Sequence, residues 1–177
     1  PARRVAEGQD RQRPGEELAF VFSFGAADRP RKVARKEALA AARAMLKEAR
    51  GLGRTLFVAD TSIHELPNAE ELAEIAVKTA RTVRKLGREP RVAFLSYSTF
   101  GNPPGNWLEN IREAVALLDQ RNPGFEYEGE MAPDAALNEV VMANYPFSRL
   151  SGPANVLIFP GLQSANLSAK LLRELGG

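Results

Sequence analysis

Apolar and polar positions follow two different patterns along this chain, and the two patterns predict its secondary structure. Short, almost continuously apolar runs are typical of strands that are buried on both faces of a sheet. Longer segments with apolar residues three and four positions apart are typical of helices that pack through one face. The patterns predict strands at 54–60, 91–98, 125–131 and 155–160, and helices at 68–86, 106–121, 134–145 and 164–175.

The order of these segments predicts the fold class. Four strand-then-helix units in succession indicate an α/β fold with a mainly parallel sheet, because each helix carries the chain back to the start of the next strand. Within the helix at 106–121, we expect Trp107 to share one buried stripe with Ile111, Val115 and Leu118.

Residues 1–50 form a poorly assigned, basic N-terminal segment. They carry 12 Lys and Arg against 7 Asp and Glu, a balance of +5, whereas residues 51–177 carry 12 against 15, a balance of −3, so that the sum is the +2 of the whole chain. After a charged lead-in we predict one strand at 18–24 and one helix at 33–50. We interpret the basic turn between them as a solvated helix entry rather than a patch for nucleic acid or phosphate.

Composition excludes several classes of function. The 177 residues contain no cysteine and a single histidine, so they offer no disulfide, no thiol nucleophile and no multi-histidine metal site. The apolar runs are shorter than the roughly 20 residues that span a membrane. The body of the chain is mildly acidic, and nothing at its start resembles a signal peptide. We therefore expect a cytoplasmic protein without nucleic-acid or membrane partners.

Polar side chains gather where the predicted strands end, which is the edge at which parallel sheets bind ligands. Hydroxyl and amide groups beside helix starts suit an anionic ligand, such as phosphate or the pantetheine-phosphate chain of an acyl-CoA. For any single residue, capping of a turn or helix is the stronger interpretation, but recurrence at successive strand ends favours a cleft. The predicted ligand-binding residues are Ser96, Ser98, Thr99, Asp134, Ser164, Asn166 and Lys170, and the end of the first strand adds Asp60, Thr61 and Ser62.

Familiar cofactor and catalytic motifs are missing from the sequence. There is no GxGxxG fingerprint and no GxxxxGK[ST] phosphate loop, so binding of NAD or ATP in the usual manner is not supported. The GxSxG element of serine hydrolases is also missing. We expect no covalently bound cofactor, and the pattern identifies no catalytic residue.

Four longer segments carry a resemblance to a known family. They read FVADTSIHELPNAEELAEIAV, EPRVAFLSYSTFGNP, FEYEGEMAPDAALN and YPFSRLSGPANVLIFPGLQSANLSAKLLRELGG. In order and spacing they are similar to the phosphate acetyl/butyryltransferase family. The part YPFSRLSGPANVL is especially similar to the version at the C-terminus of bacterial NADP-dependent malic enzymes. The resemblance covers about residues 52–177 and implies an incomplete domain at 51–177.

This resemblance implies an α/β/α sandwich with a mainly parallel sheet, of the isocitrate/isopropylmalate dehydrogenase-like type, in a homo-oligomer. It also implies acetyl-CoA or CoA and phosphate as small-molecule ligands. Active members transfer an acetyl group between CoA and phosphate. In the malic-enzyme fusions the domain resembles an acetyl-CoA sensor that inhibits the malate-decarboxylating half and helps to assemble the oligomer.

The sequence also departs from the family pattern. Phe100 in STFG stands where transferases usually place a lysine, and the Ser-Arg and Asp of active transferases belong to a segment beyond LLRELGG. We therefore expect a regulatory, acetyl-CoA-responsive domain of a malic enzyme that is inactive on its own. The alternatives are a fragment of an active phosphate acetyltransferase and a non-catalytic dimerisation module.

Overall fold

The computed structural model describes residues 55–59 and 64–176 of the chain. The strand predicted at 18–24, the helix predicted at 33–50 and the candidate residues Asp60, Thr61 and Ser62 lie outside the described residues.

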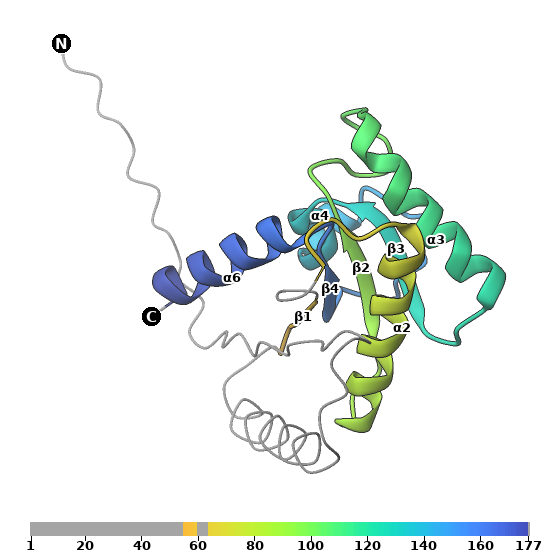
Figure 1. Cartoon of the computed structure of the whole chain (residues 1–177), viewed down its shortest axis with the longest axis horizontal. Coiled ribbons are helices and arrows are strands. Elements are labelled where there is room, and N and C mark those ends of the chain that lie inside the picture. Colours follow the sequence, from red (N-terminus) through yellow and green to blue (C-terminus); the bar gives the residue numbers. More distant parts are fainter. Residues whose placement is uncertain (1–54, 60–63, 177) are drawn as a thin grey trace.

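Four parallel strands form one sheet in the order β1-β4-β2-β3 (Figure 1). Strand β2 pairs with β4 on one side and with β3 on the other, and the register places Phe94 opposite both Ile158 and Gly129. The predicted α/β fold with a parallel sheet is therefore confirmed. The strands are β1 (Phe57–Ala59), β2 (Arg91–Leu95), β3 (Glu126–Met131) and β4 (Val156–Ile158).

Helix α2 (Ala69–Lys85) begins with a complete capping box. The Asn68 side chain accepts a hydrogen bond from the Glu71 N–H at 2.9 Å, and the Glu71 carboxylate accepts one from the Asn68 N–H at 2.9 Å. Both bonds satisfy N–H groups that the first turn of a helix leaves without a partner. Beyond the C-cap, Gly87 adopts a φ of +79°, a conformation that glycine takes without steric strain.

Helix α3 (Glu109–Arg121) follows the 3-10 turn η1 (Asn106–Leu108). Ile111, Val115 and Leu118 are buried as predicted, but the expectation for Trp107 is wrong, because its side chain is 79% exposed. Trp107 lies in the 3-10 turn, which has about 3.0 residues per turn, so it does not continue the stripe of an α-helix with about 3.6.

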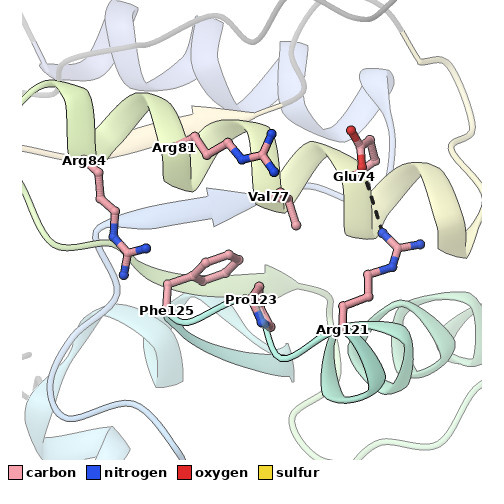
Figure 2. Close-up of a pocket in the computed structure, with 7 residues that line it drawn as sticks. All are labelled: Glu74, Val77, Arg81, Arg84, Arg121, Pro123 and Phe125. Carbon is pink, nitrogen blue, oxygen red and sulfur yellow. Dashed lines mark ion pairs between the residues drawn. The ribbon is translucent and has the colours of Figure 1, made fainter.

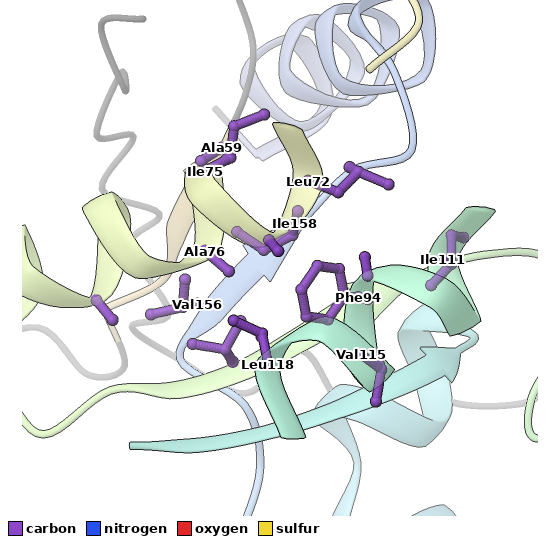
Figure 3. Close-up of a cluster of buried hydrophobic side chains, with 14 of the residues drawn as sticks. Ala59, Leu72, Ile75, Ala76, Phe94, Ile111, Val115, Leu118, Val156 and Ile158 are labelled. Carbon is purple, nitrogen blue, oxygen red and sulfur yellow. The ribbon is translucent and has the colours of Figure 1, made fainter. Parts of the chain in front are cut away.

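Side chains of the strands alternate between two apolar clusters, one on each face of the sheet. On the first face, Phe94 and Ile158 belong to a cluster with residues of α2 and α3 (Figure 3). On the second face, Leu95 and Leu157 belong to a smaller cluster that contains Leu150. The switch between neighbouring residues follows from the two-residue period of a strand.

The single helix predicted at 134–145 is also wrong in detail, because the structure has two short helices there. They are α4 (Pro133–Leu137) and α5 (Glu139–Met142). Asn138 between them has an extended backbone, and its side chain accepts a hydrogen bond from the Val140 N–H at 2.9 Å. Asparagine competes for backbone groups in this way, which favours a helix start over a helix interior.

Helix α6 (Leu162–Gly176) begins two residues earlier than predicted and projects from the sheet (Figure 1). Gly161 precedes it, and a Cβ atom there would lie 2.8 Å from the Glu65 carbonyl oxygen. Only glycine fits that approach without a shift of the backbone. Among the described helices, none is long and apolar enough to cross a membrane.

Candidate functional site

The topology places three of the predicted residues after neighbouring strands. Ser96 follows the central strand β2, Asp134 follows β3, and Ser164 follows β4, and all of these strands are parallel. Their carboxyl ends therefore share one edge of the sheet, as the sequence predicts. This edge is the candidate site, and we call it the carboxyl edge.

Ser96 is half-buried at the centre of the carboxyl edge. Its N–H donates to the Met131 carbonyl oxygen at 2.9 Å, which continues the pairing of β2 with β3 by one residue. Its hydroxyl oxygen accepts a hydrogen bond from the Ser98 N–H at 3.3 Å. The hydroxyl can still donate its own proton, since a serine side chain is both a donor and an acceptor.

Ser98 and Thr99 are buried, and their hydroxyl groups bind other parts of the protein. The Ser98 hydroxyl donates to Glu130 Oε1 at 3.3 Å, and Thr99 Oγ1 accepts from the Ala132 N–H at 2.9 Å. Both contacts join the loop after β2 to the end of β3. Their structural role is thus defined, while binding of a ligand by either residue stays a prediction.

Glu130 is the anchor of this loop and is only 1% exposed. Its carboxylate accepts hydrogen bonds from Arg112 Nε and Nη2, both at 3.0 Å, and from the Gly101 N–H at 2.7 Å. Burial alone would raise the pKa of Glu130, but the hydrogen bonds from Arg112 and from the backbone hold that pKa below its ordinary value. The loop is therefore fixed by a buried, ionised carboxylate.

A second ion-pair network lies beside the first. Arg149 donates to Glu128 from its backbone N–H at 2.9 Å and from Nη2 at 3.0 Å, and Nη1 contacts Asp119 at 2.5 Å. Its guanidinium also lies 4.8 Å from the centre of the Tyr127 ring, a cation–π distance. Burial alone would lower the pKa of Arg149, but Glu128 and Asp119 keep it above its ordinary value.

In the sequence, Glu128 and Glu130 are simply two residues of the strand predicted at 125–131. Their roles depend on Arg112 from α3 and on Arg149 from the segment before β4. Glutamates within a largely buried strand were the available signal, since a buried carboxylate needs a charged or hydrogen-bonding partner. The partner itself could not be read from the pattern.

Three aromatic rings pack together next to the loop after β2. The centre of the Phe100 ring lies 5.4 Å from that of Tyr145 and 4.9 Å from that of Phe147. These distances are typical of favourable aromatic pairs. Phe100 has a φ of +49°, and its N–H donates to the Glu130 carbonyl oxygen at 3.0 Å. The positive φ of Phe100 is thus accompanied by ring packing against Tyr145 and Phe147 and by a backbone hydrogen bond to Glu130.

Asp134 is exposed and is the second residue of α4. The N-cap of that helix is Ala132, so Asp134 does not cap it. One carboxylate oxygen of Asp134 accepts from the Ala135 N–H at 2.9 Å. The carboxylate still reaches solvent at the carboxyl edge, where it can accept a hydrogen bond.

Ser164, Asn166 and Lys170 lie on α6, within the helix predicted at 164–175. The Ser164 hydroxyl donates to the Gly161 carbonyl oxygen at 2.8 Å. Asn166 is half-buried and Lys170 is exposed, and their spacing of four residues places them on the same side of the helix. The amide group of Asn166 and the ammonium group of Lys170 therefore lie along one side of α6, which projects from the sheet.

The described part of the chain contains no group of three or more His, Cys, Asp or Glu side chains that could hold a metal ion. The chemistry that the carboxyl edge offers comes from hydroxyl, amide, carboxylate and ammonium groups. The hydroxyl, amide and ammonium groups can orient an anionic ligand by hydrogen bonds and charge.

The sequence matches the model of one protein family, phosphate acetyl/butaryl transferase, over residues 31–177. The match begins within the poorly assigned segment 1–50. The chain is 58% identical over 125 residues to an NADP-dependent malic enzyme of Rhizobium meliloti, covering 71% of the chain and 16% of that protein. It is 41% identical over 121 residues to a phosphate acetyltransferase of Clostridium acetobutylicum, covering 67% of the chain and 36% of that protein.

Two solved structures of phosphotransacetylases are also similar to this chain. The EutD phosphotransacetylase from Staphylococcus aureus superposes with a TM-score of 0.63 and 34% identity, over 68% of this chain and 38% of that one. A phosphotransacetylase from Streptococcus pyogenes superposes with a TM-score of 0.62 and 39% identity, over 67% of this chain and 36% of that one. The chain thus spans only a minor part of each of these proteins.

Proposed function

Because the chain belongs to the phosphate acetyl/butaryl transferase family, we propose that it is part of a regulatory, acetyl-CoA-responsive domain of an NADP-dependent malic enzyme. In this proposal the domain binds acetyl-CoA at the carboxyl edge and does not transfer acetyl groups by itself. Oxidative decarboxylation of malate belongs to the other half of the enzyme.

The position of Phe100 carries the regulatory part of this proposal. The family resemblance expects a lysine there, and a lysine would supply a cation to a phosphate or a thiolate. Phe100 instead packs against Tyr145 and Phe147, so this position offers an apolar surface. A domain without that cation can still bind an acyl-CoA through other contacts, but it loses charge stabilisation for the transfer reaction.

We assign the binding roles by chemistry. The Ser96 hydroxyl is at the centre of the edge and would donate to a carbonyl or phosphate oxygen of the ligand. The exposed Lys170 would contact a phosphate of the CoA chain from α6. Asp134 would accept a hydrogen bond from an amide N–H of the pantetheine chain.

Calorimetric titration of the chain with acetyl-CoA tests this assignment. Replacing Lys170 by alanine removes one charge-assisted contact and should weaken acetyl-CoA binding by about tenfold. The matched control is Arg88→Ala, which removes a cation of equal charge from an exposed position three residues beyond the end of α2. Equal losses in the two variants, or no binding by the unaltered chain, would contradict the proposed site.

An activity assay separates the regulatory proposal from its rival. The chain and its full-length parent are each supplied with acetyl phosphate and CoA, and formation of acetyl-CoA is followed. We expect no turnover above the uncatalysed rate. Sustained turnover would favour an active phosphate acetyltransferase and would overturn the regulatory role.

Assembly into an oligomer is a second proposed role, and α6 carries the observation that favours it. Leu167 and Leu171 are 56% and 59% exposed and lie four residues apart, so they form an apolar strip on a projecting helix. Equilibrium sedimentation should show self-association that Leu171→Glu weakens. Val140→Glu, at a position 79% exposed on α5, is the control; an equal effect of both changes would indicate non-specific association.

A further inference from the structure

A groove lies between α2 and the segment that joins α3 to β3, away from the carboxyl edge. It encloses about 300 Å³, at the lower end of the range for ligand pockets, roughly 300–1,000 Å³. Phe125 precedes the first residue of β3, so this groove lies toward the amino ends of the strands. Its lining residues are Glu74, Val77, Arg81, Arg84, Arg121, Pro123 and Phe125.

Three guanidinium groups surround an apolar floor in this groove. Figure 2 shows Arg84 extending from α2 beside the ring of Phe125, Arg81 extending from the same helix near Val77, and Arg121 reaching from the end of α3 toward Glu74. Val77 and Pro123 complete the apolar part of the lining. Arginine binds phosphate and carboxylate groups through paired N–H donors and also stacks on planar rings.

The three arginines differ in how far they are already paired. Arg121 contacts Glu70 and lies 3.9 Å from Glu74, so it closes one end of the groove. Arg84 contacts the exposed Glu89 at 2.5 Å and also donates to the Gly124 carbonyl oxygen. Within residues 55–59 and 64–176, Arg81 has no ion pair or side-chain hydrogen bond, although it lines the groove.

A simpler explanation for these cations is the helix dipole, because positive side chains stabilise the C-terminal end of a helix. That explanation covers Arg84 and Arg121, which lie in the last turns of α2 and α3. It does not account for Arg81, which precedes the last turn of α2 and lines the groove, whereas Arg88 lies beyond the helix and does not line it. The geometry therefore requires a comparison between Arg81 and Arg88.

We propose that this groove binds a small organic phosphate that carries an aromatic ring, of about the size of a nucleoside monophosphate. Arg81 supplies the principal charged contact to the phosphate, with Arg84 beside it. The ring of the ligand packs on Phe125 and Val77. This site is distinct from the carboxyl edge and does not depend on the function proposed there.

Calorimetry with three probes tests the two halves of the proposed ligand. Adenosine monophosphate has both an aromatic base and a phosphate. Ribose 5-phosphate has the phosphate without the aromatic base, and adenosine has the aromatic base without the phosphate. Adenosine monophosphate should bind at least about tenfold more tightly than either of the others, because each lacks one set of contacts. Equal binding of adenosine monophosphate and ribose 5-phosphate would overturn the role of the ring.

Matched variants locate the site. Arg81→Ala should weaken binding of adenosine monophosphate by about tenfold, whereas Arg88→Ala should change it by less than about twofold. Phe125→Leu keeps an apolar side chain and should abolish most of the preference for adenosine monophosphate over ribose 5-phosphate. Equal effects of the two arginine changes would mean diffuse charge attraction and would overturn the proposal, as would no detectable binding at millimolar probe.

The two binding sites can fail independently. Lys170→Ala should leave binding of adenosine monophosphate unchanged, and Arg81→Ala should leave binding of acetyl-CoA unchanged. If Arg81→Ala weakens acetyl-CoA binding and Lys170→Ala does not, the adenine end of CoA occupies the groove. That result would support the groove as a site for an aromatic phosphate and would contradict the carboxyl edge as the acetyl-CoA site.

Discussion

The two faces of the sheet are closed by different means. On the first face, α2 and α3 cover the strands with a continuous apolar layer that includes Phe94 and Leu118. On the second face, the smaller apolar cluster with Leu150 is bordered by the short helices α4 and α5. Around the edge strand β3, the ion pairs of Glu128 and Glu130 join the surrounding segments to the sheet.

This difference indicates that one region of the molecule mainly provides stability and another mainly fixes the candidate site. Apolar packing on the first face is non-directional and accommodates few polar groups. The ion pairs hold the loop after β2 in one conformation, because hydrogen bonds to a buried carboxylate require defined geometry. Ser96, Ser98 and Thr99 of the candidate site lie in this loop. We infer that the first face mainly stabilises the domain and that the β3 networks mainly fix the carboxyl edge.

A matched pair of leucine substitutions should produce the largest effect. Leu118 is completely buried in the first cluster, and Leu150 is slightly exposed in the smaller second cluster. Leu118→Ala should lower the free energy of unfolding by about 3–4 kcal/mol, and Leu150→Ala by about 2 kcal/mol, because the loss depends on how completely the site is enclosed. Urea unfolding measures both, and equal losses would remove the proposed difference between the faces.

Glu130→Gln should have an intermediate effect on stability. The change keeps the size of the side chain but removes the charge that Arg112 and the Gly101 N–H bind. We expect a loss of about 1.5–3 kcal/mol at neutral pH, the range for hydrogen bonds to charged groups. Glu113→Gln, at an exposed position of α3, is the control and should have almost no effect.

The same pair of variants gives a pH test. The pKa of Glu130 in the fold lies below the ordinary value of 4.5, so its ionised form stabilises the fold at neutral pH. That contribution is present above the unfolded pKa and is lost as the pH falls from about 5 through the folded pKa. Glu130→Gln should therefore flatten the acid limb of the stability curve, and Glu113→Gln should not. An unchanged acid limb in Glu130→Gln would show that this carboxylate is not the anchor of the loop.

Much of the architecture could be predicted from local patterns. The strand and helix periods identified the four described strands and the parallel sheet, because burial on a sheet or on one helix face leaves a direct trace in the sequence. Trp107 shows where such reasoning fails. Its spacing fits the stripe of α3, but it lies in a 3-10 turn, whose different period turns the side chain out to solvent.

The candidate site was predictable in its location but not in its internal contacts. Strand ends carrying Ser96, Asp134 and Ser164 do share one edge. However, the burial of Ser98 and Thr99 could not be predicted, because their hydroxyl groups bind Glu130 and the Ala132 N–H, more than thirty residues further along the chain. Hydrogen bonds between such distant residues have no periodic signature.

The sequence by itself therefore determined the class of fold, the family resemblance and the edge where ligands are expected. These depend on composition and on periods that each segment carries within itself. Tertiary structure alone decided which polar groups remain available and which are used internally, as in the pairing of Glu130 with Arg112. It also decided that Arg81 and Phe125 meet in one groove. The physical reason is that such contacts join residues far apart in the chain, and only the packing of α2, α3 and β3 brings them within reach.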